Sequence, residues 1–136
     1  MMPRQVNNPF AERQALQKRR SELIDELKRL TMSERSWLDE HAPALEEGDA
    51  ATKAEFARQM EVRYNLNYEL GDTEWRLGNT PDALTNLRAA YDYGSDEVRL
   101  KVVDTLRDIQ NRTGLQLLRA SDLRAGDNIA ESTSPS

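Results

Sequence analysis

The only imidazole of this 136-residue chain, His41, comes first among residues that could do chemistry, because the chain contains no cysteine. A zinc site needs several His or Cys ligands, and a di-iron bundle needs two Glu-x-x-His pairs, whereas the residue three before His41 is Leu38. As a general base, His41 would need an orienting carboxylate and a nucleophile, but Ser36 lies five residues back and Glu40 points elsewhere on a helix. We therefore expect an ordinary helix-end histidine, no metal, no cofactor and no enzymatic activity.

The densest group of carboxylates comprises Glu69, Asp72 and Glu74. No twelve-residue calcium-loop pattern accompanies it, so we interpret this group as a solvated acidic patch. Glycines occur singly, most of them at the ends of predicted helices, and no glycine-rich phosphate loop is present. The residue types therefore indicate no small-molecule substrate.

Basic residues in the first thirty positions are the candidates for binding nucleic acid. The net charge is −5, but residues 1–30 carry seven basic and four acidic groups, whereas residues 31–97 carry six and fifteen. Cations on one helix can track phosphates, although Glu22, Asp25 and Glu26 interleave with them at spacings that form ion pairs within a helix. Contact with nucleic acid and a merely solvated helix face both remain open. The candidate residues are Arg13, Lys18, Arg19, Arg20, Lys28 and Arg29.

A narrow apolar stripe follows the same N-terminal helix. Leu16, Leu23 and Leu30 recur every seven residues with Leu27 beside them, and Arg20 interrupts the seam. This pattern is typical of a helix laid against one partner helix. The partner helix can belong to this chain, which makes the stripe core, or to another molecule, which makes it a docking or self-association seam. The partner-binding candidates are Leu16, Leu23, Leu27, Leu30 and Tyr93, the last beside a helix-ending glycine.

Helical periodicity extends over nearly the whole sequence and predicts an all-α fold. The first helix should begin at Asn8-Pro9, where the proline loses no hydrogen bond. Thr31 and Glu34 have the spacing of a capping box, which predicts the start of a second helix. Pro43 predicts a kink or a break of that helix near His41.

A long helix over residues 50–78 should form the centre of the fold, because it carries apolar residues on two faces. Trp75 lies on one of these faces and is expected in the core, and Gly71 in the interior indicates the close approach of another backbone. Cap signals at Thr80-Pro81-Asp82 and at Ser95-Asp96-Glu97 begin two further helices. Residues 115–123 are the candidate for one more short helix.

The predicted architecture is a compact bundle of five or six helices in antiparallel hairpins. Residues 1–8 are expected to be a flexible N-terminus, residues 9–124 a single helical domain, and the Ser-rich residues 125–136 a disordered tail. Within the domain, residues 9–30 can project as an interaction helix.

Small residues in the third and fourth predicted helices prompt a comparison with helical repeats. Residues 64–97 contain Leu70-Gly71, Gly78, Ala83 and Ala90 at the spacings that let two antiparallel helices approach closely. In these positions the segment resembles one tetratricopeptide repeat. The resemblance implies a helical hairpin whose concave surface binds a peptide or a partner helix.

The absence of catalytic patterns favours a non-enzymatic protein-interaction module, such as an adaptor, assembly factor, small chaperone or inhibitor, that binds a protein partner or itself. One alternative is a structural component of a virion or another large assembly. A second alternative is a nucleic-acid-associated regulator that uses the basic N-terminal helix. No run of eighteen apolar residues and no export leader is present, and cysteine is absent, so we expect no membrane association and a cytoplasmic location.

Overall fold

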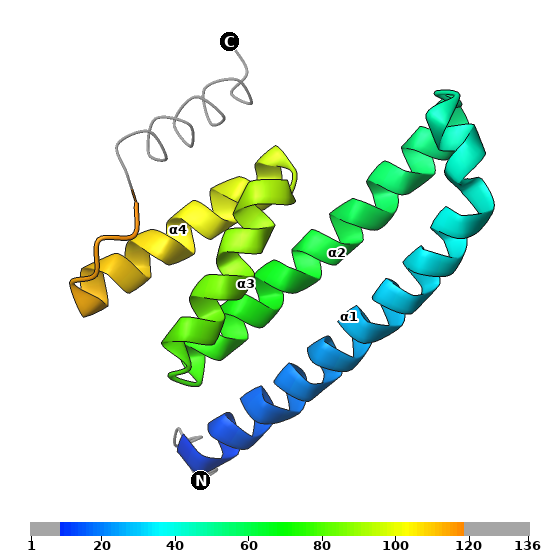
Figure 1. The fold of residues 1–136 in the computed structure, drawn as a ribbon. Helices are drawn as coiled ribbons and strands as arrows, with labels where there is room; N and C mark the ends of the chain where they lie inside the picture. Colours follow the sequence, from blue (N-terminus) through cyan, green and yellow to red (C-terminus); the bar gives the residue numbers. More distant parts are fainter. Residues whose placement is uncertain (1–8, 119–136) are drawn as a thin grey trace, which may run out of the picture.

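A computed structural model describes residues 9–118, and within this range the chain forms helices and no strand. The all-α prediction is confirmed. The helices are α1 (Pro9–Glu46), α2 (Ala50–Arg76), α3 (Thr80–Tyr93) and α4 (Asp96–Thr113). The described part of the chain therefore holds four helices instead of the five or six that the sequence predicted (Figure 1).

The prediction of a second helix beginning at Thr31 is wrong, because α1 runs without interruption from Pro9 to Glu46. The Thr31 hydroxyl donates to the carbonyl oxygen of Leu27 over 2.9 Å, which is a bond of a helix interior. Glu34, the expected partner in the capping box, instead accepts from Arg63 of α2 at 2.6 Å. A contact between helices thus replaces the local cap.

Pro43 does not break α1, although it lies inside the helix. Proline lacks the N–H that would bond to the carbonyl of Asp39 and its ring crowds that carbonyl, so it bends the preceding turn, while the last residues of α1 continue the helix to Glu46. Figure 1 shows the axis of α1 bending in the cyan and teal turns near this end. The expected kink is therefore present, and the expected break is not.

The ends of the other helices lie where local capping signals placed them. Asp49 caps α2 by accepting from the amide of Thr52 at 2.9 Å, and Ser95 caps α4 by accepting from the amide of Val98 at 3.4 Å. Gly78, with φ of +84°, ends α2 in the left-handed conformation that glycine adopts without strain. Residues 115–118 are not helical, and the rest of the proposed short helix lies outside the described residues.

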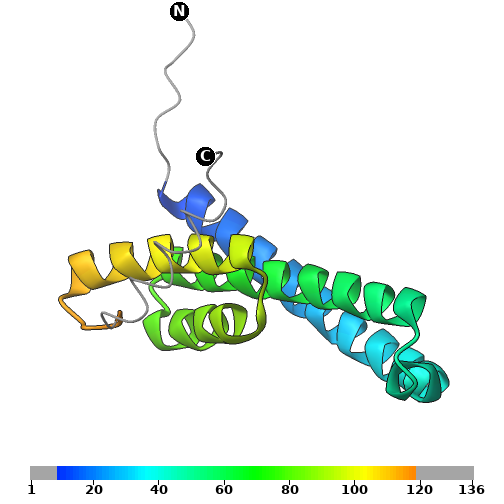
Figure 2. The ribbon, with the colours of Figure 1, turned by 90° about the horizontal axis from the view of Figure 1, so that it is seen from above.

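Helix α2 is the centre of the fold, as predicted. Among the described helices, α1 packs only against α2, whereas α2 also contacts α3 and α4 (Figures 1 and 2). Helices α2 and α3 approach closely at Gly71, where an added Cβ would lie 2.7 Å from Leu87 Cγ and 3.3 Å from the Ala83 carbonyl oxygen. A side chain and a backbone group therefore both occupy the space that glycine leaves.

The apolar core is concentrated at one end of the molecule. Leu87, Val98, Val102 and Ile109 are fully buried between α3 and α4 and close to α2. Of the described hydrophobic residues between positions 24 and 69, none is buried. The side-chain contacts of α2 with α3 and α4 lie between Tyr64 and Trp75, and the ring of Tyr64 lies 5.8 Å from that of Tyr93.

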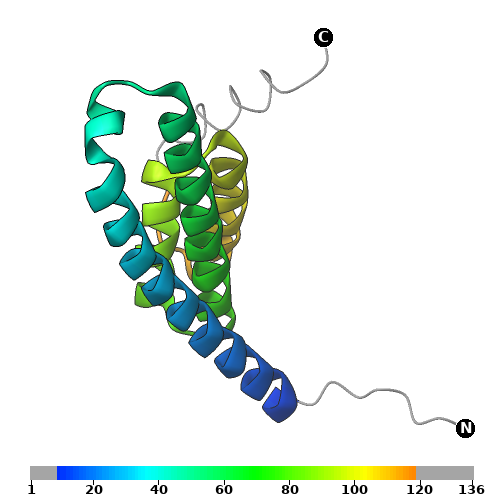
Figure 3. The same cartoon turned by 90° about the vertical axis from the view of Figure 1, so that its right-hand side faces the viewer.

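The far half of the α1–α2 hairpin, residues 31–63, therefore extends beyond the core, and we call it the arm. Figure 1 shows the arm reaching past α3 and α4 at the upper right, and Figure 3 shows the same end at the top. Within it, Trp37 stacks on His41 with ring centroids 4.5 Å apart and on Phe56 at 6.3 Å. These rings are half-buried, so the arm is a pair of helices with no closed core.

The segments predicted to be flexible or disordered, residues 1–8 and 125–136, lie outside the described residues.

Candidate docking surfaces on the α1–α2 hairpin

The leucine stripe of α1 faces α2, and this position corrects part of the predicted partner-binding set. Leu23 is fully buried, so it belongs to the core and is not available to a partner. Leu16, Leu27 and Leu30 are half-buried. The seven-residue spacing identified the packing face of α1, and much of that face is covered by the chain's own α2.

An apolar groove nevertheless remains beside the covered stripe. A hollow of about 480 Å³ is lined by α1 side chains, among them Ile24, Leu27 and Met32, with Leu70 of α2. A second hollow of about 280 Å³ continues it along α1 and shares Thr31 with it. We call the combined feature the α1 groove; its lining residues are Ile24, Leu27, Lys28, Thr31, Met32, Glu34, Arg35, Leu38, Asp39 and Leu70.

Apolar side chains in the α1 groove reach solvent to different degrees. Met32 is 76% exposed, and Leu27 and Leu38 are half-buried. Contiguous apolar surface of this kind marks interaction sites more often than single scattered side chains do. Of the predicted partner-binding residues, Leu27 is the one that lines this groove.

Charged residues divide the α1 groove into two ends. Lys28 and Arg35 precede Asp39 along α1, and within residues 9–118 none of these three forms an ion pair. Glu34 is different, because Arg63 binds it at 2.6 Å and ties α1 to α2. The groove therefore offers two free cations and one free anion.

Three of the six nucleic-acid candidates hold helices together instead of facing solvent freely. Arg13 donates to the carbonyl oxygen of Leu77 at 3.3 Å, and Arg19 binds both carboxylate oxygens of Glu69 at 2.8 and 2.9 Å. The Glu69 hydrogen bond and charge raise the pKa of Arg19. Arg20 donates to Glu74. The other candidates, Lys18, Lys28 and Arg29, are exposed.

The carboxylates of residues 69–74 are not the solvated patch that the sequence suggested. Glu74 is 1% exposed, and its carboxylate accepts hydrogen bonds from Arg20 of α1 and from the side-chain amide of Asn79 at 2.8 Å. Asp72 pairs with Arg76 at 3.0 Å. The sequence contained a signal for this pair: Arg20 interrupts the apolar seam of α1. A charge on a buried seam needs a partner of opposite charge, and Glu74 is that partner.

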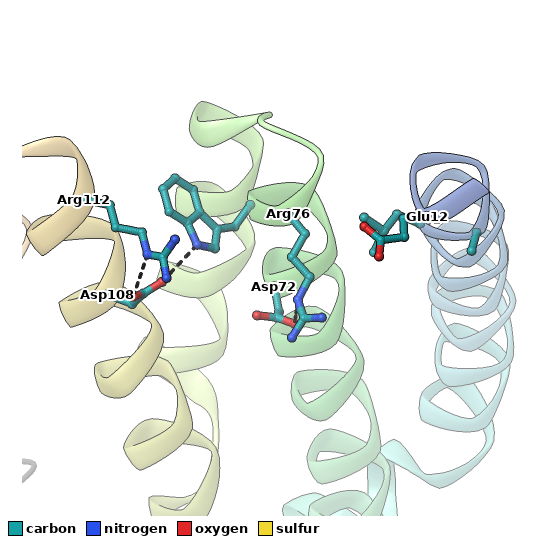
Figure 4. Close-up of a pocket in the computed structure, with 8 residues that line it drawn as sticks. Glu12, Asp72, Arg76, Asp108 and Arg112 are labelled. Atoms are coloured by element: carbon teal, nitrogen blue, oxygen red, sulfur yellow. Dashed lines mark hydrogen bonds and ion pairs between the residues drawn. The ribbon is translucent and has the colours of Figure 1, made fainter. Parts of the chain in front are cut away.

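A charged cleft of about 750 Å³ lies on the other flank of α2, between α1 and α4 (Figure 4). Figure 4 shows the Asp72–Arg76 pair between Glu12 of α1 and the Asp108–Arg112 pair of α4. Each arginine is bound by the acid four residues before it on the same helix, at 3.0 Å in both cases. The cleft thus presents two ion pairs and the additional carboxylate of Glu12, and it is not a cationic cradle for an anionic ligand.

Aromatic residues outside the arm occupy both core and surface positions. Trp75 packs against the α3–α4 core and donates from Nε1 to Asp108 at 3.3 Å, which confirms its predicted core position. Tyr93 is 70% exposed and lies beside Tyr64. Burial raises the pKa of Tyr64. The surface thus offers Tyr93 to a partner, at the end of α3 next to the base of the arm.

The described residues offer neither a metal site nor a membrane-spanning helix. They contain no cluster of three or more His, Asp or Glu side chains placed to bind a metal ion. None of their helices combines the length and the apolar character needed to cross a bilayer. His41 is half-buried, with Nδ1 2.9 Å from the carbonyl oxygen of Trp37.

Comparison of the chain with protein-family models, with curated proteins and with solved structures finds no match.

Proposed function

We propose that this chain is a non-enzymatic protein-interaction module that binds its partner along the arm. One observation carries the proposal: the arm is built from two long helices but buries none of its hydrophobic side chains, while the α1 groove, whose apolar part lies at the base of the arm, continues onto the arm as far as Asp39. Helices gain most of their stability by burying an apolar face, so a two-helix layer with half-covered aromatics favours a further covering element.

The dimensions of the α1 groove suit a helix as that covering element. Its lining spans residues 24–39 of α1, which at 1.5 Å per residue is roughly 24 Å or about four helical turns. Amphipathic helices bind such grooves through side chains spaced three, four and seven residues apart. A partner helix of this length would contact the apolar lining from Ile24 to Leu38.

Protein is favoured over nucleic acid as the partner. Arg13, Arg19 and Arg20 already bind groups of α2 and its C-terminal end, which leaves few free cations to neutralise phosphates. An electrophoretic mobility shift with duplex and single-stranded probes at low salt would support nucleic-acid binding instead. A concave peptide-binding surface, which the resemblance of residues 64–97 to a tetratricopeptide repeat implies, is a separate proposal.

The test is capture of partners by matched variants. Met32→Glu places a charge in the α1 groove, and Leu115→Glu places the same charge on another exposed apolar side chain, outside the arm. Both variants should keep the far-ultraviolet circular dichroism of the wild type, since both side chains are exposed.

We expect the wild type and the Leu115→Glu variant to retain the same partner from an extract of the source cells, and the Met32→Glu variant to lose it. Titration calorimetry with the purified partner then measures the loss. Equal binding of that partner by all three proteins would place the docking surface elsewhere and contradict the proposal.

A further inference from the structure

We propose that the α1 groove binds a second copy of this chain, with the two α1 helices antiparallel across a two-fold axis near residue 37. This inference rests on the proposed function and names the partner of that surface. It follows from the order of charges along α1, because cations come first and anions last, so two copies that run in opposite directions place opposite charges side by side.

The free charges of the groove face lie on one strip of α1. Lys28, Arg35, Asp39 and Glu46 follow each other at spacings of seven, four and seven residues, which places them on one side of a helix. Within residues 9–118, none of the four forms an ion pair. The strip therefore runs from two cations to two anions.

Across a two-fold axis, the basic half of this strip in one copy faces the acidic half in the other copy. Arg35 and Asp39 are equally distant from residue 37, and so are Lys28 and Glu46. In an antiparallel pair, Arg35 of each copy lies opposite Asp39 of the other copy, and an interface of this kind repeats every contact twice. A parallel pair would set like charges against each other, so charge selects the antiparallel arrangement.

The Arg35–Asp39 contact is the decisive one. These residues lie nearest the proposed axis and both line the α1 groove. Lys28 and Glu46 lie farther out, and the bend of α1 near Pro43 changes the direction of the turn that carries Glu46 (Figure 1). Apolar contact comes from Leu38 and Met32, which line the groove on either side of Arg35.

The size of the contact sets the expected affinity. A contact from Lys28 to Glu46, roughly 28 Å long and about one helix diameter, 10 Å, wide, buries about 280 Å² of each copy and about 560 Å² in total, which is less than half the area of a stable specific interface. The net charge of −5 per chain also opposes association. We therefore expect a weak dimer with a Kd of roughly 0.1 to 1 mM.

Sedimentation equilibrium of the full chain from about 0.02 to 2 mM in about 0.15 M salt tests the inference at concentrations that bracket this Kd. The wild type should pass from monomer to dimer. Arg35→Asp and Asp39→Arg should each raise the Kd at least tenfold, because each places two like charges across the axis. The double variant with both exchanges restores opposite charges and should return the Kd to within about threefold of the wild type.

Arg107→Asp is the matched control, because Arg107 is also exposed but lies on α4, away from the groove. It should dimerise like the wild type, and all variants should keep wild-type helicity. A wild type that stays monomeric throughout, or a double variant that associates no better than the single ones, overturns the inference. Neither result affects the capture experiment with the Met32→Glu and Leu115→Glu variants, so failure of the dimer is distinguishable from failure of the proposed function.

Discussion

Removal of the Arg20 guanidinium should destabilise the fold far more than its place on a charged helix suggests. The Arg20→Met variant leaves the Glu74 carboxylate, which is 1% exposed, with Asn79 as its remaining side-chain donor. Breaking a buried ion pair by removing one partner costs about 3–5 kcal/mol. Water reaches the arginine side, because that side chain is 39% exposed, so we expect a loss of about 2 kcal/mol.

Urea denaturation followed by circular dichroism measures this loss. With a slope of about 2 kcal/mol per molar urea for a protein of this size, the midpoint should fall by about 1 M. The double variant Arg20→Met/Glu74→Met replaces the pair by apolar side chains of similar size and should recover most of the stability. Arg19→Met is the matched control: the Arg19–Glu69 pair is exposed on both sides, so its loss should move the midpoint much less.

Equal shifts for Arg20→Met and Arg19→Met would show that burial of Glu74 does not set the cost. A double variant no more stable than Arg20→Met would show that the arginine acts by packing and not by its charge. Either outcome refutes the reasoning.

Two further perturbations test single contacts. Gly71→Ala should improve helix propensity by about 1 kcal/mol, but the added methyl would meet the fully buried Leu87 at 2.7 Å, so we expect a net loss of about 1 kcal/mol in urea denaturation. A more stable variant would contradict that packing. The second perturbation concerns acid pH: hydrogen bonds from Thr52 hold the pKa of Asp49 below its ordinary value of 3.8, so the stabilising effect of the carboxylate is complete above this value and is lost as the pH falls through the folded pKa. The Tm difference between the wild type and Asp49→Asn should therefore shrink from about pH 5 to about pH 2, and a difference independent of pH would exclude the carboxylate as its cause.

Most helix ends could be predicted because their causes are local. Asp49, Gly78 and Ser95 act on groups within a few residues, and such contacts are visible in the order of the residues alone. The exception, at Thr31 and Glu34, has a distant cause. Arg63 binds Glu34 from the other helix, and nothing near Glu34 in the sequence indicates that partner.

The candidate site was predictable only in part, for a related reason. A seven-residue repeat shows that α1 has an apolar face, but it does not show which molecule covers that face. Leu23 is covered by this chain, whereas Leu27, one turn later, borders an open groove. Likewise, Arg20 and Glu74 are 54 positions apart, so their pairing depends on the register of two helices.

Helix length explains why α3 covers only the C-terminal half of α2. Helix α2 has 27 residues and is about 40 Å long, whereas α3 has 14 residues and spans about 21 Å. Because α3 begins at the C-terminal end of α2 and runs back along it, it reaches only about half-way, to the contact between Tyr93 and Tyr64. Beyond that point α2 has only α1 beside it, and the rings of Phe56 in α2 and Trp37 in α1 stay half-buried although they stack on each other. The arm thus retains an apolar surface that its own chain is too short to cover, and this is the physical basis for expecting a second molecule there.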